Sequence, residues 1–221
     1  MRGIAALMVL LAGAVVVAIH NPYVAPKYQQ LAGAVQEMRV GVGDGGWQGS
    51  GVHLGDGWIL TAQHIFGNPL DIEWIRWGDH SCDLPSIGLG DPSVDVGWIW
   101  CEDASGEPLI PLCWDVGLIG GRDYIFVGYP KGLLVIDRGD LVARIADRPA
   151  YTFGLERGAS GGAVVVEGHE GWCVVDTITT LWKSGEMTLV LGVGNEAMKG
   201  DWGRRGLWGT SSPSDNSENG N

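Results

Sequence analysis

Short apolar runs alternate with glycine, aspartate and proline breaks along the chain from Arg39 onward. This pattern is typical of β-strands joined by tight turns, and it predicts an all-β fold. Gly55-Asp56-Gly57 lies between two of the runs and predicts a hairpin turn, since aspartate and glycine tolerate the positive φ that such turns require. The expected strands are Met38–Val42, Gly51–Leu54, Trp58–Thr61, Ile72–Trp77, Asp83–Leu89, Val96–Cys101, Tyr124–Gly128, Leu133–Val135, Leu141–Ile145, Tyr151–Leu155, Gly162–Val166, Trp172–Thr179 and Thr188–Val193, with a short helix beginning within Asn195–Gly200.

The N-terminal segment Gly3–Ile19 is apolar and uncharged and follows a single basic residue, Arg2. This is the layout of a secretory signal or a membrane anchor, and as a helix the segment would reach about 25 Å, the short end of the membrane-spanning range. Ala12-Gly13-Ala14 offers a cleavage site, but cleavage there would leave Val15–Ile19 as an apolar stub, which favours an uncleaved anchor. The absence of a polar face disfavours a buried core helix. We therefore expect the rest of the chain to lie outside the cytoplasm, either anchored by a single span or secreted.

Changes in composition divide the chain into four parts. Residues 1–20 are the expected signal peptide or anchor helix, and residues 21–37 form a polar, proline-bearing stalk. Residues 38–200 are the expected folded domain. Residues 201–221 are an expected disordered tail, because Gly209–Asn221 has no large apolar side chain.

Composition and charge exclude several classes of protein. Glycine supplies 37 of the 221 residues but follows no G-x-y period, which excludes collagen. With 45% hydrophobic and 18% charged residues the chain can bury a sizeable core, which argues against a disordered protein. The formal net charge of −12 argues against a nucleic-acid partner, because phosphate binding needs clustered lysine and arginine.

Four cysteines, Cys82, Cys101, Cys113 and Cys173, permit two disulfides in an exported chain, with three possible connectivities. Four free buried thiols are the alternative. Among the pairs we favour Cys101–Cys113, because it closes a short loop. His80-x-Cys82 could contribute to a zinc site, but the chain has no C-x-x-C pair, and we expect neither a metal nor a cofactor.

Three polar residues stand next to apolar strands. Ser160 lies in Gly158-Ala159-Ser160-Gly161-Gly162, on a glycine-flanked turn directly before an apolar run. His64 follows the strand Trp58–Thr61 in the sequence T-A-Q-H. Asp95 leads the strongly apolar strand Val96–Cys101, where a buried carboxylate is costly unless another group pairs with it.

Together these residues resemble the trypsin-like, chymotrypsin-fold serine peptidases. The matching motifs are T-A-x-H at Thr61–His64, the aspartate of Asp95-Val96 and G-x-S-G-G at Gly158–Gly162, in the order and spacing of that family. Val127–Gly132 and Leu189–Lys199 look more like the HtrA/Deg-type proteases, although no PDZ domain follows Lys199 and no Ile-Val-Gly-Gly activation site is present. The resemblance implies two six-stranded antiparallel β-barrels, here preceded by the N-terminal hydrophobic helix.

The resemblance also implies a role for each residue of a Ser-His-Asp triad. A serine hydroxyl is a weak nucleophile at neutral pH, so Ser160 needs His64 as a base, and Asp95 would fix the tautomer of His64. The backbone N–H groups of Gly158 and Ser160 would form the oxyanion hole. Protein or peptide substrates follow from this chemistry, whereas the oligomeric state does not.

The specificity pocket is implied less directly. The resemblance puts its base near Gly154 and one wall along Thr177, Ile178 and Thr179. No acidic residue occupies the base position, so we expect small or medium apolar side chains at P1, the substrate residue before the scissile bond, rather than lysine or arginine.

Three other functions remain open. The chain could be a catalytically inactive, protease-like binding module, although all three triad residues are present. It could be a viral or phage-type processing peptidase, which shares the chemistry and differs in substrate. An exported adhesion or carbohydrate-binding domain could use some of the 11 tryptophans as stacking platforms, but most of them lie in apolar strands.

Overall fold

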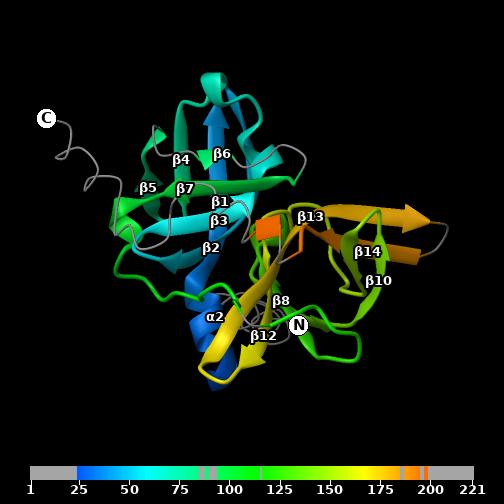
Figure 1. The fold of residues 1–221 in the computed structure, drawn as a ribbon. Coiled ribbons are helices and arrows are strands. Elements are labelled where there is room, and N and C mark those ends of the chain that lie inside the picture. Colours follow the sequence, from blue (N-terminus) through cyan, green and yellow to red (C-terminus); the bar gives the residue numbers. More distant parts are fainter. Residues whose placement is uncertain are drawn as a thin grey trace, which may run out of the picture.

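The computed structural model describes residues 24–84, 88–89, 94–114, 116–184, 187–194 and 197–198. Two antiparallel sheets, one from each half of the chain, account for most of this part (Figure 1). The all-β prediction is therefore confirmed. Each sheet has seven strands instead of the expected six.

The first sheet has the strand order β5-β4-β1-β2-β3-β7-β6. The predicted hairpin at Gly55–Gly57 joins β2 to β3, and Asp56 (φ 49°) and Gly57 (φ 79°) both have positive φ. A second tight turn at Gly78 (φ 58°) starts β5. Of the run expected as one strand over 83–89, Gly88 and Leu89 form the short strand β6, whereas Asp83 and Leu84 follow the end of β5 and are not in a strand. The bounds are β1 Val35–Val42, β2 Gly45–Gly55, β3 Trp58–Ala62, β4 Trp74–Trp77, β5 His80–Cys82, β6 Gly88–Leu89 and β7 Val96–Trp100.

The second sheet has the order β10-β11-β14-β13-β12-β8-β9. Its longest strand, β13, continues five residues beyond the predicted end at Thr179. The strand expected over Tyr151–Leu155 ends at Tyr151, and the rest of that run forms a loop. The bounds are β8 Tyr124–Gly128, β9 Val135–Gly139, β10 Leu141–Ile145, β11 Arg148–Tyr151, β12 Ala163–Gly168, β13 Gly171–Ser184 and β14 Met187–Gly192.

Helical segments are short. The α-helix α2 spans Gln29–Ala34 and directly precedes β1. A short helix was expected to begin within Asn195–Gly200. Ala197 and Met198 are helical, and the other residues of this range lie outside the described residues. The 3₁₀ segments whose full length lies in the described residues are η1 Pro26–Tyr28, η2 Gln63–Phe66, η3 Pro69–Asp71, η5 Glu102–Ala104 and η6 Pro130–Gly132.

A shared apolar core lies between the two sheets and includes α2. Leu31 and Ala34 of this helix are fully buried and belong to one cluster with Val52 and Trp98 of the first sheet and Val165 of the second. The other main clusters lie within one half of the chain each. The helix therefore stabilises the relative position of the two sheets by burying apolar surface against both.

This packing corrects the expectation of a stalk over residues 21–37. Within the described part of that range, Lys27 accepts a hydrogen bond from Nε1 of Trp172 (2.9 Å) through its carbonyl, and the rings of Tyr28 and Trp172 lie 5.8 Å apart. Leu31 and Ala34 are three residues apart on α2 and share its buried face, and Val35, the first residue of β1, is also fully buried. The folded domain thus begins before residue 38.

The disulfides also differ from the expected pairing. Cys82 is bonded to Cys101 (Cα–Cα 4.3 Å) and Cys113 to Cys173 (Cα–Cα 5.0 Å). The favoured pair Cys101–Cys113 was wrong because strand pairing outweighs loop length. Cys101 and Cys82 lie in the core of the first sheet, whereas the N–H of Cys113 donates to the carbonyl of Val174, next to Cys173.

The expected signal or anchor segment, residues 1–20, and the expected tail, residues 201–221, lie outside the described residues. In the part of the chain that the structure describes, no helix combines the length and the apolar content needed to cross a bilayer.

Candidate active site

His64 and Asp95 are brought together by the pairing of β3 with β7. The last residue of β3, Ala62, pairs with Val96, the first residue of β7, so the residues just beyond this pair are neighbours. Asp95 has positive φ (57°), and its carbonyl accepts the N–H of Gln63 (3.2 Å). The strand register therefore fixes the backbone of both residues before their side chains interact.

The Asp95 carboxylate holds the His64 ring in one orientation. Oδ2 lies 2.9 Å and Oδ1 3.1 Å from Nδ1 of His64, and Oδ1 also accepts the backbone N–H of His64 at 2.9 Å. A carboxylate only accepts hydrogen bonds, so Nδ1 carries the proton and Nε2 of a neutral ring is the basic nitrogen. The side chain of His64 is 47% exposed, which leaves Nε2 accessible to a reactant.

Ser160 lies on a turn that two glycines make possible. Gly158 (φ 90°) and Gly161 (φ 80°) have positive φ, which residues with a side chain rarely adopt. Gly161 donates its N–H to the carbonyl of Ile178 (2.7 Å), and Gly162 donates to the carbonyl of Ala159 (3.0 Å). The first bond attaches the turn to β13 of the second sheet, and the second closes the turn itself.

The same turn packs against the first sheet. A Cβ atom at Gly161 would lie 2.0 Å from the carbonyl oxygen of Ser50 and 2.3 Å from Oγ1 of Thr61, so no side chain fits there. The N–H of Ser50 donates to the carbonyl of Ser160 (2.8 Å). Ser160 is thereby held beside the end of β3, from which the chain continues to His64.

Among the described residues no hydrogen bond joins the Ser160 hydroxyl to His64. Hydrogen bonds between catalytic groups are often long in a protein without its substrate.

Two backbone N–H groups of the turn have no hydrogen-bond acceptor among the described residues. Within the described part of the chain, neither Gly158 nor Ser160 donates its N–H to another protein group. A Cβ atom at Gly158 would lie 3.0 Å from the backbone nitrogen of Lys131, so the turn is also confined on this side. The arrangement offers two donors to a developing negative charge.

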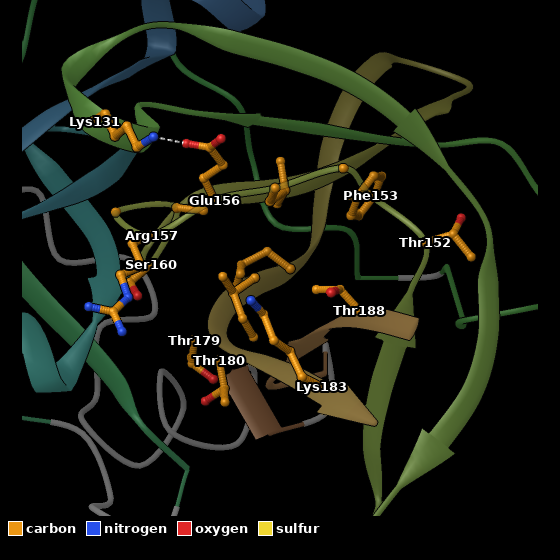
Figure 2. A pocket seen from close by; sticks show the side chains of 16 residues that line it. Lys131, Thr152, Phe153, Glu156, Arg157, Ser160, Thr179, Thr180, Lys183 and Thr188 are labelled. Carbon is orange, nitrogen blue, oxygen red and sulfur yellow. Dashed lines mark ion pairs between the residues drawn. The ribbon is translucent and has the colours of Figure 1, made fainter. Parts of the chain in front are cut away.

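A cleft of about 1000 Å³ adjoins Ser160 (Figure 2). Of the predicted pocket residues, Gly154, Ile178 and Thr179 line it. Thr177 does not; it is fully buried and donates its hydroxyl to the carbonyl of Gly162 (3.3 Å). The lining residues are Lys131, Thr152, Phe153, Gly154, Leu155, Glu156, Arg157, Gly158, Ala159, Ser160, Ile178, Thr179, Thr180, Leu181, Lys183 and Thr188.

Several charged residues of the cleft were not predicted from the sequence. Lys131 and Glu156 form an ion pair across one side of the cleft, and Arg157 and Lys183 also line it (Figure 2). Lys183 was missed because the strand was expected to end at Thr179. The alternation of Thr179, Leu181 and Lys183 was the available signal, since alternate residues of a strand share a face.

Asp176 lies behind the cleft wall and is fully buried. Its carboxylate accepts the hydroxyl of Tyr151 (2.9 Å) and the N–H groups of Thr177 (2.8 Å), Val193 (2.7 Å) and Gly194 (2.6 Å). Burial raises the pKa of Asp176 to about 6, although all four hydrogen bonds act in the opposite direction. The residue ties β13 to the end of β14 and does not line the cleft.

No cluster of three histidine, cysteine, aspartate or glutamate side chains suited to a metal ion occurs among the described residues.

No family model and no curated protein matches the sequence, whereas solved structures of proteases have a similar arrangement of strands. The chain is similar to the Rv3671c protease from M. tuberculosis in its active form (TM-score 0.63, 18% identity, 84% of each chain covered). It is also similar to the serine endoprotease from Yersinia pestis (TM-score 0.65, 20% identity, 84% of this chain and 68% of that one). The chain therefore has the chymotrypsin fold of the trypsin-like serine proteases.

Proposed function

We propose that the chain is a serine endopeptidase in which Ser160 is the nucleophile, His64 the general base and Asp95 the residue that orients His64. The observation that carries the proposal is the 2.9 Å contact between Nδ1 of His64 and Asp95, made beside the strand end against which the Ser160 turn packs. The protease neighbours of the same fold support a serine protease function.

In the first half of the proposed reaction, the Ser160 oxygen attacks the carbonyl carbon of the scissile peptide bond while its proton passes to Nε2 of His64. The N–H groups of Gly158 and Ser160 bind the oxygen that becomes negative. Each such donor typically lowers the barrier by about 2.7 to 4 kcal/mol. The imidazolium then gives its proton to the leaving amine as the C–N bond breaks, which leaves an acyl-enzyme ester on Ser160.

In the second half, water attacks the ester carbonyl and gives one proton to Nε2 of His64. The C–O bond to Ser160 breaks, the serine oxygen takes the proton back, and the carboxylic acid product leaves. Asp95 stabilises the imidazolium in both halves and keeps its own charge.

We further propose that this domain works outside the cytoplasm, either secreted or tethered to the membrane through residues 1–20. Two disulfides support an exported domain, because cytoplasmic thiols are usually kept reduced. Protein or peptide substrates follow from the proposed reaction.

Labelling with a fluorophosphonate probe followed by peptide mapping tests the proposal. We expect covalent labelling at Ser160, loss of labelling in Ser160→Ala and retention in the control Ser81→Ala, since Ser81 is exposed on β5. Labelling that survives Ser160→Ala would show that the nucleophile is assigned wrongly. An unlabelled, folded wild-type protein would favour the inactive binding module, and self-cleavage products in a pure sample would favour a processing peptidase.

A further inference from the structure

The net charge of the side chains that line the cleft is positive, whereas the net charge of the whole chain is negative. The chain has a formal net charge of −12. The cleft is lined by three cations, Lys131, Arg157 and Lys183, and by one carboxylate, Glu156. A local excess of positive charge in an acidic protein favours a negatively charged group of a substrate.

The negative groups near the cleft already have partners. Glu156 forms its ion pair with Lys131. Asp137 accepts the N–H of Gly154 (2.8 Å) and that of Arg138 (2.9 Å) with its two oxygens. In the described residues neither Arg157 nor Lys183 has an ion-pair partner, so the positive charge of these two side chains is not compensated within the cleft.

Lys183 is the cation that reaches the interior of the cleft. It lies on β13, paired with Thr188 of β14, on the same strand as Ile178, whose carbonyl holds the Ser160 turn. Figure 2 shows its side chain extending from the strand toward the middle of the cleft. Leu181 precedes it by two residues and also lines the cleft. The cleft therefore combines an apolar wall with an amino group.

We propose that Lys183 determines specificity by pairing with a glutamate side chain at P1, an inference that rests on the proposed peptidase function. A substrate that fills the cleft removes water from the Lys183 amino group, and this is costly unless a carboxylate replaces the water. The methylene groups of glutamate match the apolar wall at Ile178 and Leu181, and the shorter aspartate reaches less far along β13. This assignment replaces the earlier expectation of an apolar P1 residue and retains the exclusion of basic ones.

Peptide substrates that differ only at P1 test this assignment. For the wild-type protein we expect kcat/KM for glutamate to exceed that for glutamine by about 10- to 100-fold, the range typical of a charge-assisted hydrogen bond. Lys183→Met, which removes the charge and keeps most of the length of the side chain, is expected to remove this ratio. Lys183→Glu is expected to favour lysine over glutamate. The control Arg144→Met removes an exposed cation of β10 outside the cleft and is expected to keep the glutamate preference.

Equal kcat/KM for glutamate and glutamine in the wild-type protein overturns the assignment, and so does a glutamate preference that persists in Lys183→Met. Binding of the same peptides to Ser160→Ala separates this inference from the proposed reaction. Tighter binding of the glutamate peptide that depends on Lys183, together with a wild-type protein that hydrolyses neither peptide, would support the site and contradict the peptidase. Hydrolysis of the glutamate and glutamine peptides at equal rates would support the peptidase and contradict the role of Lys183.

Discussion

The backbone N–H of Ser50 in the first sheet donates a hydrogen bond to the carbonyl of Ser160 in the second half of the chain (2.8 Å). The hydroxyl of Ser50 accepts the N–H of Tyr129 (2.8 Å), and its carbonyl accepts the hydroxyl of Thr61 (2.6 Å). One fully buried serine thus connects the proposed nucleophile, the strand that leads to His64 and the end of β8. The geometry of the site depends on this contact between the sheets.

Replacing Ser50 with alanine is expected to reduce stability far more than it reduces activity. The substitution leaves the buried N–H of Tyr129 without its acceptor, which costs about 1 to 3 kcal/mol in the free energy of unfolding. The backbone bond to Ser160 does not involve the side chain and remains. Urea unfolding of Ser50→Ala, compared with Ser81→Ala on the exposed face of β5, measures the effect; equal midpoints for the two variants would contradict it.

A side chain at Gly161 is expected to disable the site. An alanine Cβ would lie 2.0 Å from the carbonyl oxygen of Ser50, and the φ of 80° is unfavourable for alanine. The turn must shift, and a displacement of about 1 Å in a catalytic group can cost about 100-fold in rate. We expect kcat to fall at least that far in Gly161→Ala and to stay unchanged in the control Gly106→Ala, where a Cβ meets no atom within 4 Å. Comparable kcat values for the two variants would show that the close packing is unimportant.

Asp95→Asn tests the orientation of the imidazole. The amide of the new asparagine can donate a hydrogen bond to Nδ1 of His64, which favours the tautomer that carries its proton on Nε2. In that tautomer Nε2 cannot accept the proton of Ser160. A fall in kcat of about 10⁴-fold with a small change in KM is expected. Asp103→Asn, at an exposed position of η5, is the control and should match the wild-type protein. A loss below tenfold in Asp95→Asn would remove Asp95 from the catalytic machinery.

The buried carboxyl of Asp176 is expected to make stability depend on pH between about 4 and 6. Its pKa is raised from 3.8 to about 6 in the folded chain, so the folded state keeps a proton that the unfolded state loses. The free energy of unfolding therefore falls as the pH rises through this window, by about 3 kcal/mol in total, and this contribution is constant above it. Above pH 6 the charged group is retained in the core by its four hydrogen bonds.

Asp176→Asn should remove this slope. The amide oxygen can accept the three N–H groups that now bond to Oδ1, and the amide nitrogen can donate to the hydroxyl of Tyr151. The measurement is the difference in unfolding free energy between wild-type and variant protein from pH 3.5 to 7, with Asp140→Asn as an exposed control. A difference that does not change with pH would mean that Asp176 keeps an ordinary pKa.

Most strands could be predicted from the sequence because the periodicity of apolar residues reports burial directly. Strands such as Val96–Trp100 and Tyr124–Gly128 are buried along their whole length and stand between clear turn residues. The resemblance to the trypsin-like peptidases predicted that His64 and Asp95 are neighbours, and the register of β3 and β7 brings the two strand ends that carry them together.

Other features depend on contacts between distant parts of the chain and had weaker local signals. The burial of Leu31 and Ala34 requires both sheets to be in place. Disulfide pairing follows strand neighbours, which loop length does not report. The charge of the cleft is assembled from two loops and a strand, and Lys183 lies beyond the point where the apolar pattern of its strand weakens.

The place of α2 in the core has a practical consequence for producing the isolated domain. A shortened protein that began at Met38 would lack Leu31, Ala34 and Val35, all fully buried, and would expose apolar side chains of both sheets to water. Such a protein is expected to bind hydrophobic dyes and to aggregate. A protein that begins at Val24 retains the helix together with the contact between Lys27 and Trp172, and this is where a boundary for crystallisation or for the peptide assays should be drawn.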